Sequence, residues 1–128
     1  MIYLIDTFAW VEYALGTAKG QILRSFFQKK EDKFITLESC LGEIKGYCLR
    51  NRLDFRKFLA VVRANSIVLP ILMEHWLSAA EIRYHLKKKI PRFGFMDALL
   101  VARQKELKCK IISGDPHFES LQGILYMK

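Results

Sequence analysis

The sequence has only three cysteines, Cys40, Cys48 and Cys109, and no two of them form a C-x-x-C pair. This scarcity argues against a disulfide framework and against a zinc site. Each cysteine lies in an apolar stretch, where a free thiol acts as a small core side chain. The pattern fits a protein of a reducing compartment.

Long apolar runs are also missing. No stretch approaches the roughly 20 residues that a helix needs to cross a bilayer. The apolar run at the N-terminus ends at Asp6, so we expect no signal peptide and no membrane partner. Linkers, repeats and biased segments are absent, and 128 residues suffice for one domain with a real core. We therefore predict a cytoplasmic protein with a single domain over residues 1–128.

Negative charge is the scarcer sign, because 13 acidic side chains stand against 21 lysines and arginines, a net charge of +8. Such an excess attracts polyanions, although it also aids solubility, and charge alone does not separate the two. Clustered cations are candidate phosphate contacts, with solvated helix ends as the ordinary alternative. Two such groups are Lys87, Lys88, Lys89 with Arg92, and Arg50 with Arg52.

Short apolar strands alternate with helical patterns along the chain. Strands are predicted at 2–5, 33–36, 66–69 and 110–113, with 124–127 as a candidate fifth, and 66–69 is expected to be buried. Helices are predicted at 8–15, 17–30, 39–50, 54–64, 74–88 and 96–107. The alternation predicts an α/β fold, a three-layer α/β/α sandwich around a mostly parallel sheet of four to five strands.

Three aspartates stand at the ends of predicted elements. Asp6 closes the first strand, Asp97 opens the most apolar helix, and Asp115 follows the strand 110–113. Taken singly, each is explained more simply as a helix cap. Taken together, they converge if the first and fourth strands are neighbours, since ligands bind beyond the carboxyl ends of parallel strands.

Carboxylates that converge repel one another unless a cation neutralises them. Oxygen ligands suit Mg²⁺ or Mn²⁺, and such a site beside a phosphate performs metal-assisted phosphodiester hydrolysis. Glu43 is a fourth candidate, because it lies inside a predicted helix where capping does not explain it. Its place at the border of the apolar face is, however, usual for a solvated glutamate, and taken alone this is the favoured interpretation.

Four stretches resemble PIN domains, particularly VapC toxins, and they follow in the order of that family. Residues 5–13, with Asp6, resemble the opening of the family, and residues 35–44 resemble the strand and helix with its second acid, here Glu43. Residues 94–102 are similar to the stretch with the third acid, Asp97. Residues 113–118 resemble the fourth, Asp115, with serine where the family usually has threonine.

The resemblance implies a Mg²⁺- or Mn²⁺-dependent endoribonuclease that acts on RNA. It further implies a toxin of a VapBC-type pair, a homodimer held inactive by a cognate antitoxin protein. The acids Asp6, Glu43, Asp97 and Asp115 would be catalytic and metal-binding residues, with Thr7 and Ser113 orienting them through their hydroxyls. Phe8 departs from the family, which often has a small hydroxyl residue there; this removes a hydrogen bond but none of the acids.

Several alternatives remain at this point. The chain could be an RNA-processing PIN nuclease without a toxin role, or a non-catalytic PIN module that binds RNA or protein, although all four acids argue against the latter. A phosphoacceptor receiver domain needs an aspartate after its third strand, where this chain has Pro70. His117 and Glu119 match the H-x-E of zinc deaminases, but the P-C-x-x-C partner is missing. We interpret His117 as a turn residue beside Asp115.

Overall fold

The structure, a computed structural model, describes all 128 residues. The elements, in chain order, are β1 (Ile2–Ile5), α1 (Thr7–Leu15), α2 (Ala18–Phe27), β2 (Lys33–Leu37), α3 (Glu38–Asn51), α4 (Phe55–Asn65), β3 (Ile67–Leu69), α5 (Met73–Leu86), α6 (Phe95–Leu107), β4 (Lys110–Ser113), the 3₁₀ turn η1 (Pro116–Phe118) and β5 (Ile124–Tyr126). The predicted α/β alternation is confirmed. None of the helices has both the length and the apolar character that a membrane crossing needs.

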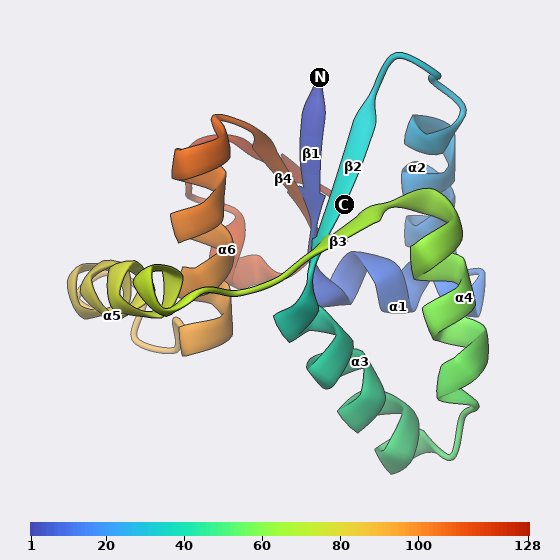
Figure 1. Cartoon of the computed structure of the whole chain (residues 1–128), viewed down its shortest axis with the longest axis horizontal. Helices are drawn as coiled ribbons and strands as arrows, with labels where there is room; N and C mark the ends of the chain where they lie inside the picture. The colour runs from blue at the N-terminus through green and yellow to red at the C-terminus, as the bar shows by residue number, and fades with distance from the viewer.

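The five strands form one sheet in the order β3-β2-β1-β4-β5, and all four pairings are parallel (Figure 1). β1 pairs with β4, with Ile5 opposite Ile112, so the condition for the convergence of Asp6 and Asp115, that the first and fourth strands are neighbours, is met. The chain runs outward to one side through β2 and β3 and to the other side through β4 and β5. The point between β1 and β4 is therefore the topological switch, beyond which such sheets bind ligands.

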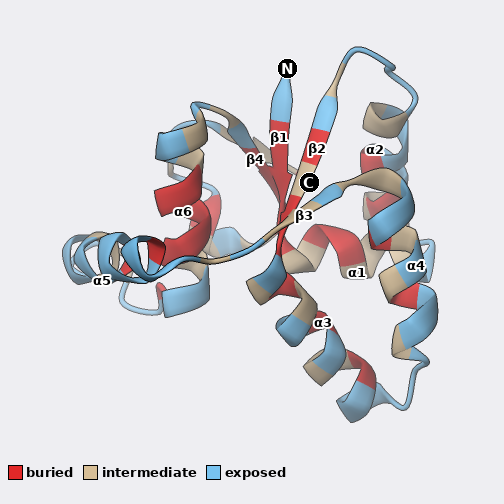
Figure 2. Cartoon of the chain, in the orientation of Figure 1, coloured by how far each residue is buried: buried red, intermediate tan, exposed pale blue.

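Alternate side chains of the central strand enter two different cores. Tyr3 and Ile5 pack with residues of α1 to α4, whereas Leu4 packs with residues of α5 and α6. This alternation follows from the two-residue repeat of a strand and requires helices on both faces of β1. Figures 1 and 2 show the resulting three layers, with buried residues along both sides of the sheet.

The prediction that residues 66–69 form a buried strand is wrong in its burial. Ile67 is 61% exposed, and Val68 and Leu69 are only half-buried. The reason is the strand order, which puts β3 at the edge of the sheet. An apolar run predicts a strand, but the run does not carry information about which strands lie in the middle.

Two helices end earlier than predicted, α2 at Phe27 and α5 at Leu86. After α2, the Lys29 N–H donates to the carbonyl of Phe26, and after α5 the Lys89 N–H donates to that of Leu86. These bonds span three residues, the spacing of a 3₁₀ turn, so the lysine-rich segments leave the helix before their last predicted turn.

Helices α1 and α2 meet at a corner that has no room for a side chain at position 20. A Cβ on Gly20 would lie 2.3 Å from the Glu12 carbonyl oxygen, which is backbone and does not move away easily. We expect Gly20→Ala to destabilise the fold by about 1–3 kcal/mol, as overpacking does. Gly42→Ala is the matched control, because a Cβ there meets nothing within 4 Å. It should stabilise its helix by about 0.5–1 kcal/mol. Urea denaturation midpoints measure both, and equal midpoints would contradict the packing argument.

Candidate active site

Asp6 connects β1 to α1 and is buried, with only 3% of its surface exposed. Its Oδ1 accepts a hydrogen bond of 2.8 Å from the Ala9 N–H, so it caps α1 as the local sequence indicated. Its Oδ2 accepts a second bond from the hydroxyl of Ser113, at the end of β4. Burial raises the pKa of Asp6 to about 7, although both of these bonds oppose the shift, and the charges of Asp115 and Asp97 add to it.

Ser113 joins the ends of the two central strands. It is fully buried, and besides donating to Asp6 its Oγ accepts a bond of 2.9 Å from the Asp115 N–H. The Oδ1 of Asp115 in turn accepts from the His117 N–H at 2.9 Å and caps η1. One hydroxyl thus fixes the relative position of two carboxylates that are 109 residues apart in sequence.

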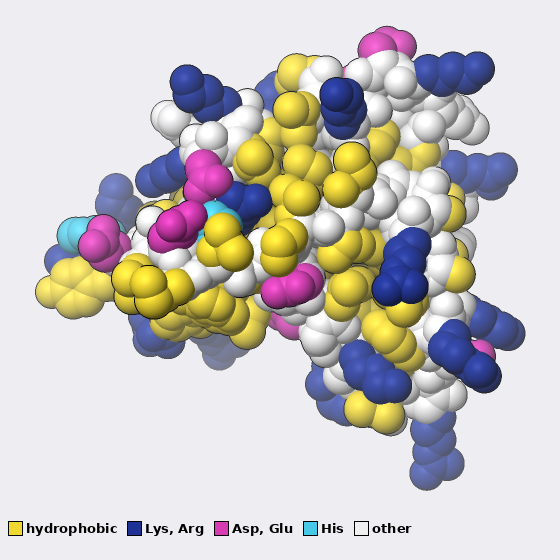
Figure 3. All heavy atoms as spheres, viewed as in Figure 1, with side chains coloured by type: hydrophobic (Ala, Val, Ile, Leu, Met, Phe, Trp, Pro, Cys, Tyr) yellow, Lys and Arg dark blue, Asp and Glu magenta, His cyan; other side chains and the backbone are white.

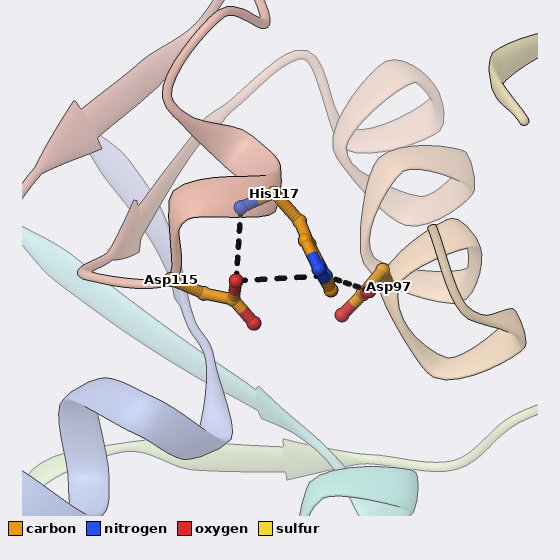
Figure 4. Close-up of side chains that lie close together, drawn as sticks. All are labelled: Asp97, Asp115 and His117. Atoms are coloured by element: carbon orange, nitrogen blue, oxygen red, sulfur yellow. Dashed lines mark hydrogen bonds and ion pairs between the residues drawn. The ribbon is translucent and has the colours of Figure 1, made fainter. Parts of the chain in front are cut away.

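Asp97 reaches the same region from the first turn of α6. Its Oδ2 accepts from the Gly94 N–H at 3.1 Å and lies 3.2 Å from Nδ1 of His117. That nitrogen is also 3.5 Å from Oδ1 of Asp115, and Figure 4 shows the three side chains pointing toward one another. One ligand atom from each lies within 4.8 Å of the others. Partial burial raises the pKa of Asp97, and Asp115 raises it further, against the Gly94 and His117 bonds.

Glu43 faces this group from α3. Its Oε1 accepts a bond of 2.7 Å from the hydroxyl of Thr7, the first residue of α1. Partial burial raises the pKa of Glu43, and the charges of Asp97 and Asp115 raise it further, whereas the Thr7 bond lowers it. The four acids therefore repel one another, although the closest group contains Asp97, Asp115 and His117 and neither Asp6 nor Glu43.

A protein-family model matches the amino-acid sequence. The PIN domain model matches residues 3–124, which is nearly the whole chain. The chain belongs to the PIN-domain family.

Solved structures share the fold of this PIN domain at low sequence identity. VapBC2 from Rickettsia felis, bound to a DNA fragment from its promoter, superposes with a TM-score of 0.75 at 13% identity, over 98% of this chain and 97% of that one. A toxin-antitoxin complex from Klebsiella pneumoniae gives 0.76 at 12% identity, over 98% of each chain. No curated protein matches the sequence. The likeness to these two complexes concerns the fold.

A cleft of about 370 Å³ opens beside the acids of the PIN domain. Its wall includes Thr7, Glu43 and Asp115, with Phe8 and Tyr47 among its aromatic lining. Phe8, the residue that departs from the family, packs on Gly114, where a Cβ would lie 2.5 Å from the ring. The bulk of Phe8 is thus matched by the missing side chain at position 114.

The acids of this PIN domain have no lysine or arginine to neutralise them. None of Asp6, Glu43, Asp97 and Asp115 forms an ion pair with such a residue, and the only basic side chain in contact is His117. Four carboxyl groups without a lysine or arginine partner, with the pKa values of Asp6, Glu43 and Asp97 raised, have the chemistry of a Mg²⁺ or Mn²⁺ site. The residues present therefore fit a divalent cation.

His117 is the residue that the sequence interpretation underestimated. The prediction that His117 lies in a turn beside Asp115 is correct. Its ring, however, also contacts Asp97. The Asp-Pro-His order predicts the first contact, because it starts a tight turn with both residues on it. The second depends on where α6 lies against the sheet, and no local pattern contains that.

The two predicted groups of basic residues do not gather in one place. Lys87, Lys88, Lys89 and Arg92 follow α5, whereas Arg50 and Arg52 lie at the far end of α3, two turns beyond Glu43. In Figure 1 these two helices extend to opposite sides of the molecule. The two predicted groups thus lie on two distant surfaces.

We expect Ser113→Ala to destabilise the PIN domain and to weaken the binding of Mn²⁺. The alanine leaves the Asp115 N–H and Oδ2 of Asp6 without their buried partner, and such a loss costs about 1–3 kcal/mol. Ser113→Thr is the control, since it keeps the hydroxyl. Thermal melting and calorimetric Mn²⁺ titration measure the two effects. If alanine and threonine behaved alike, the hydroxyl would have no part in holding the acids.

Proposed function

We propose that this PIN domain is a divalent-metal-dependent endoribonuclease and the toxin of a VapBC-type pair. The observation that carries the proposal is the set of four carboxyl groups at one sheet edge, from β1, α3, α6 and the β4–η1 connection. Three of them have raised pKa values and none has a lysine or arginine partner. We further propose that residues 1–128 act as one domain in the cytosol, where three free cysteines stay reduced.

In this proposal Asp6, Asp97 and Asp115 hold the cation, and Ser113 and the Gly94 N–H hold two of these carboxylates in place. When bound, Mg²⁺ or Mn²⁺ lowers the pKa of a water molecule and polarises a phosphoryl oxygen. Glu43, oriented by Thr7 at the cleft, has a raised pKa suited to accepting the proton of the attacking water. Water adds to the phosphorus, the P–O3′ bond breaks and O3′ takes a proton from the solvent, which leaves a 5′-phosphate and a 3′-hydroxyl.

Cleavage of a defined RNA with mapped ends tests the activity. We expect fragments with 5′-phosphate and 3′-hydroxyl ends in Mg²⁺ or Mn²⁺, and no cleavage in excess chelator. Cyclic 2′,3′-phosphate ends would require attack by the ribose hydroxyl and would contradict the role of water. Cleavage that persists in chelator would contradict the role of the cation.

The toxin role is supported by the two structural neighbours, both of which were solved as toxin-antitoxin assemblies. Expression of the chain should therefore arrest growth, and co-expression of the protein encoded beside it should restore growth. An RNA-processing nuclease without a toxin role would cut RNA in the assay above and leave growth unaffected. The two readouts thus separate the enzyme from its biological role.

We also propose that a second copy covers the start of α5. Met73 and Leu77 are 77% and 61% exposed, with Leu72 and Trp76 beside them, and a patch of this kind marks a protein contact. Leu77→Asp should then convert a dimer into a species of 15.0 kDa. Leu49→Asp is the control, because Leu49 is 68% exposed at the end of α3. Light scattering reports the masses, and a wild-type monomer would refute the contact.

A further inference from the structure

A second concave site lies apart from the acidic cleft, where α5 passes the first turn of α6. It encloses about 470 Å³ and is lined by Ala80, Arg83, Tyr84, Lys87, Lys88 and Phe95. Three of these residues are cations, two are aromatic and none is acidic. We name it the α5–α6 pocket.

The positive charge of the α5–α6 pocket is not neutralised by the protein. Neither Arg83, Lys87 nor Lys88 takes part in an ion pair. The Nε of Arg83 is in addition buried and has no hydrogen-bond partner. Buried N–H groups in folded proteins are almost always bonded, so the protein itself does not satisfy the guanidinium of Arg83. An anionic oxygen is the acceptor that an arginine takes most readily.

The aromatic side chains of the pocket are open to a partner. Tyr84 is 66% exposed, and the Nζ of Lys88 lies 4.8 Å from the centre of its ring. Phe95 is 36% exposed and is held on its other side by Trp76, at 5.7 Å between ring centres. Exposed rings among cations are what proteins use to bind single-stranded nucleic acid, because bases stack on the rings while phosphates meet the cations.

The pocket is also close to the acids along the chain. Phe95 is two residues before Asp97 on α6, about 3 Å along the helix axis, but side chains two residues apart do not face each other, so the two lie on different sides of the helix. In Figure 3, lysine and arginine side chains gather below the apolar surface at the end of the molecule that α5 occupies. A strand cut at Asp97 would therefore have to pass around the first turn of α6 to reach the α5–α6 pocket.

We propose that the α5–α6 pocket binds single-stranded RNA at a subsite outside the acidic cleft. A phosphate contacts Arg83 and Lys88, and the adjacent base stacks on Tyr84. The inference rests on the proposed function, because it takes RNA as the substrate, and it gives the substrate a definite path. It also distinguishes the two groups of basic residues, because Lys87 and Lys88 line the pocket whereas Arg50 and Arg52 do not.

Binding of a 5′-fluorescent 12-nucleotide oligouridine in EDTA, followed by anisotropy over a series of salt concentrations, tests the pocket. The double variant Arg83→Met/Lys88→Met should reduce the slope of log K against log salt by about 1.4, because each phosphate contact on a single strand contributes about 0.7. The matched control is Lys33→Met/Lys110→Met, which removes two exposed lysines at the amino ends of β2 and β4. Its slope should stay that of the wild type.

Tyr84 separates stacking from charge. Tyr84→Ala should weaken binding at least about fivefold with the slope unchanged, since base–aromatic stacking is lost without loss of an ion contact. Tyr84→Phe keeps the ring and should bind like the wild type. Equal slopes for both double variants, or an unchanged affinity of Tyr84→Ala, would overturn the proposal. So would variants that alter the mass of the protein but not its RNA affinity, because a protein partner would then cover the pocket.

The outcomes for the pocket and for the proposed function are distinguishable. RNA cleavage by the wild type, together with unchanged RNA binding by the pocket variants, refutes the pocket alone. Pocket-dependent binding without cleavage in Mn²⁺ supports the pocket and refutes the nuclease. Circular dichroism melts of each variant confirm that the compared proteins are folded.

Discussion

Asp97→Asn should reduce RNA cleavage by about 1,000-fold and leave the protein folded. A cation that polarises the phosphoryl oxygen supplies several kcal/mol of transition-state stabilisation, and each 1.36 kcal/mol is a factor of ten in rate. The asparagine has the same shape as aspartate, and its carbonyl oxygen still accepts from the Gly94 N–H at the start of α6. The change therefore removes charge and leaves the helix start intact.

The control for this variant is another aspartate that begins a helix. Asp54 caps α4, where its Oδ1 accepts from the Arg56 N–H at 3.0 Å. Asp54→Asn removes the same charge at the start of another helix, away from the four acids, and should cleave RNA at the wild-type rate. Comparable losses in both variants would mean that net charge, and not the carboxylate at position 97, controls cleavage.

The calorimetric Mn²⁺ titration of Asp97→Asn gives a readout that does not depend on turnover. We expect affinity to fall, because one anionic ligand is replaced by a neutral one. A folded variant that bound Mn²⁺ as the wild type does, yet failed to cleave, would assign Asp97 to positioning the substrate. Full activity in the folded variant would refute the metal-assisted mechanism.

The sequence predicted the meeting of Asp6 and Asp115 because a simple rule of sheets covers it. Both follow short apolar strands, and parallel strands present their carboxyl ends at one edge. The rule also requires that β1 and β4 are neighbours. No local pattern shows this, and the structure does, through the pairing of Ile5 with Ile112. Asp6 caps α1 and also joins the other acids, because its Oδ1 accepts from the Ala9 N–H while its Oδ2 accepts from the Ser113 hydroxyl.

Other features depend on packing between distant elements and have no local signal. The exposure of β3 follows from its position at the edge of the sheet. The contact of His117 with Asp97 follows from the way α6 packs against the sheet. The pairing of Phe8 with Gly114 is of the same kind, because one bulky residue is accepted only where another side chain is absent. Such compensation becomes visible when both positions are seen together.

The metal-free protein should lose stability as the pH rises from about 4 to about 7. In the folded state the pKa of Asp6 is raised to about 7, above the 3.8 of an ordinary aspartate in the unfolded chain, and burial is the main cause. Between these values the folded state binds more protons than the unfolded state, so raising the pH favours unfolding. The contribution of Asp6 is fully present below pH 4 and is lost through pH 7. The raised pKa values of Glu43 and Asp97 act in the same direction.

The comparison of the wild type with Asp6→Asn isolates this effect from the change in overall charge. The amide cannot ionise, and the Ser113 hydroxyl can accept from it as well as donate. The difference in unfolding free energy between the two proteins, from urea titrations in EDTA, should therefore change by at most about 1.36 kcal/mol per pH unit. A difference that did not vary with pH would show that Asp6 is ionised throughout.

Mn²⁺ should reverse the loss at neutral pH, because the cation binds the deprotonated acids of the folded state and not the unfolded chain. At 100 times its dissociation constant, a ligand of this kind adds about 2.7 kcal/mol to the free energy of unfolding. The gain should be small near pH 4.5, where protons compete for the same oxygens, and large at pH 8. A gain that is equal at both pH values, or equal in Asp6→Asn, would contradict binding at these carboxylates. In this proposal Asp6, which lowers the stability of the metal-free protein at neutral pH, is thus also a ligand of the cation.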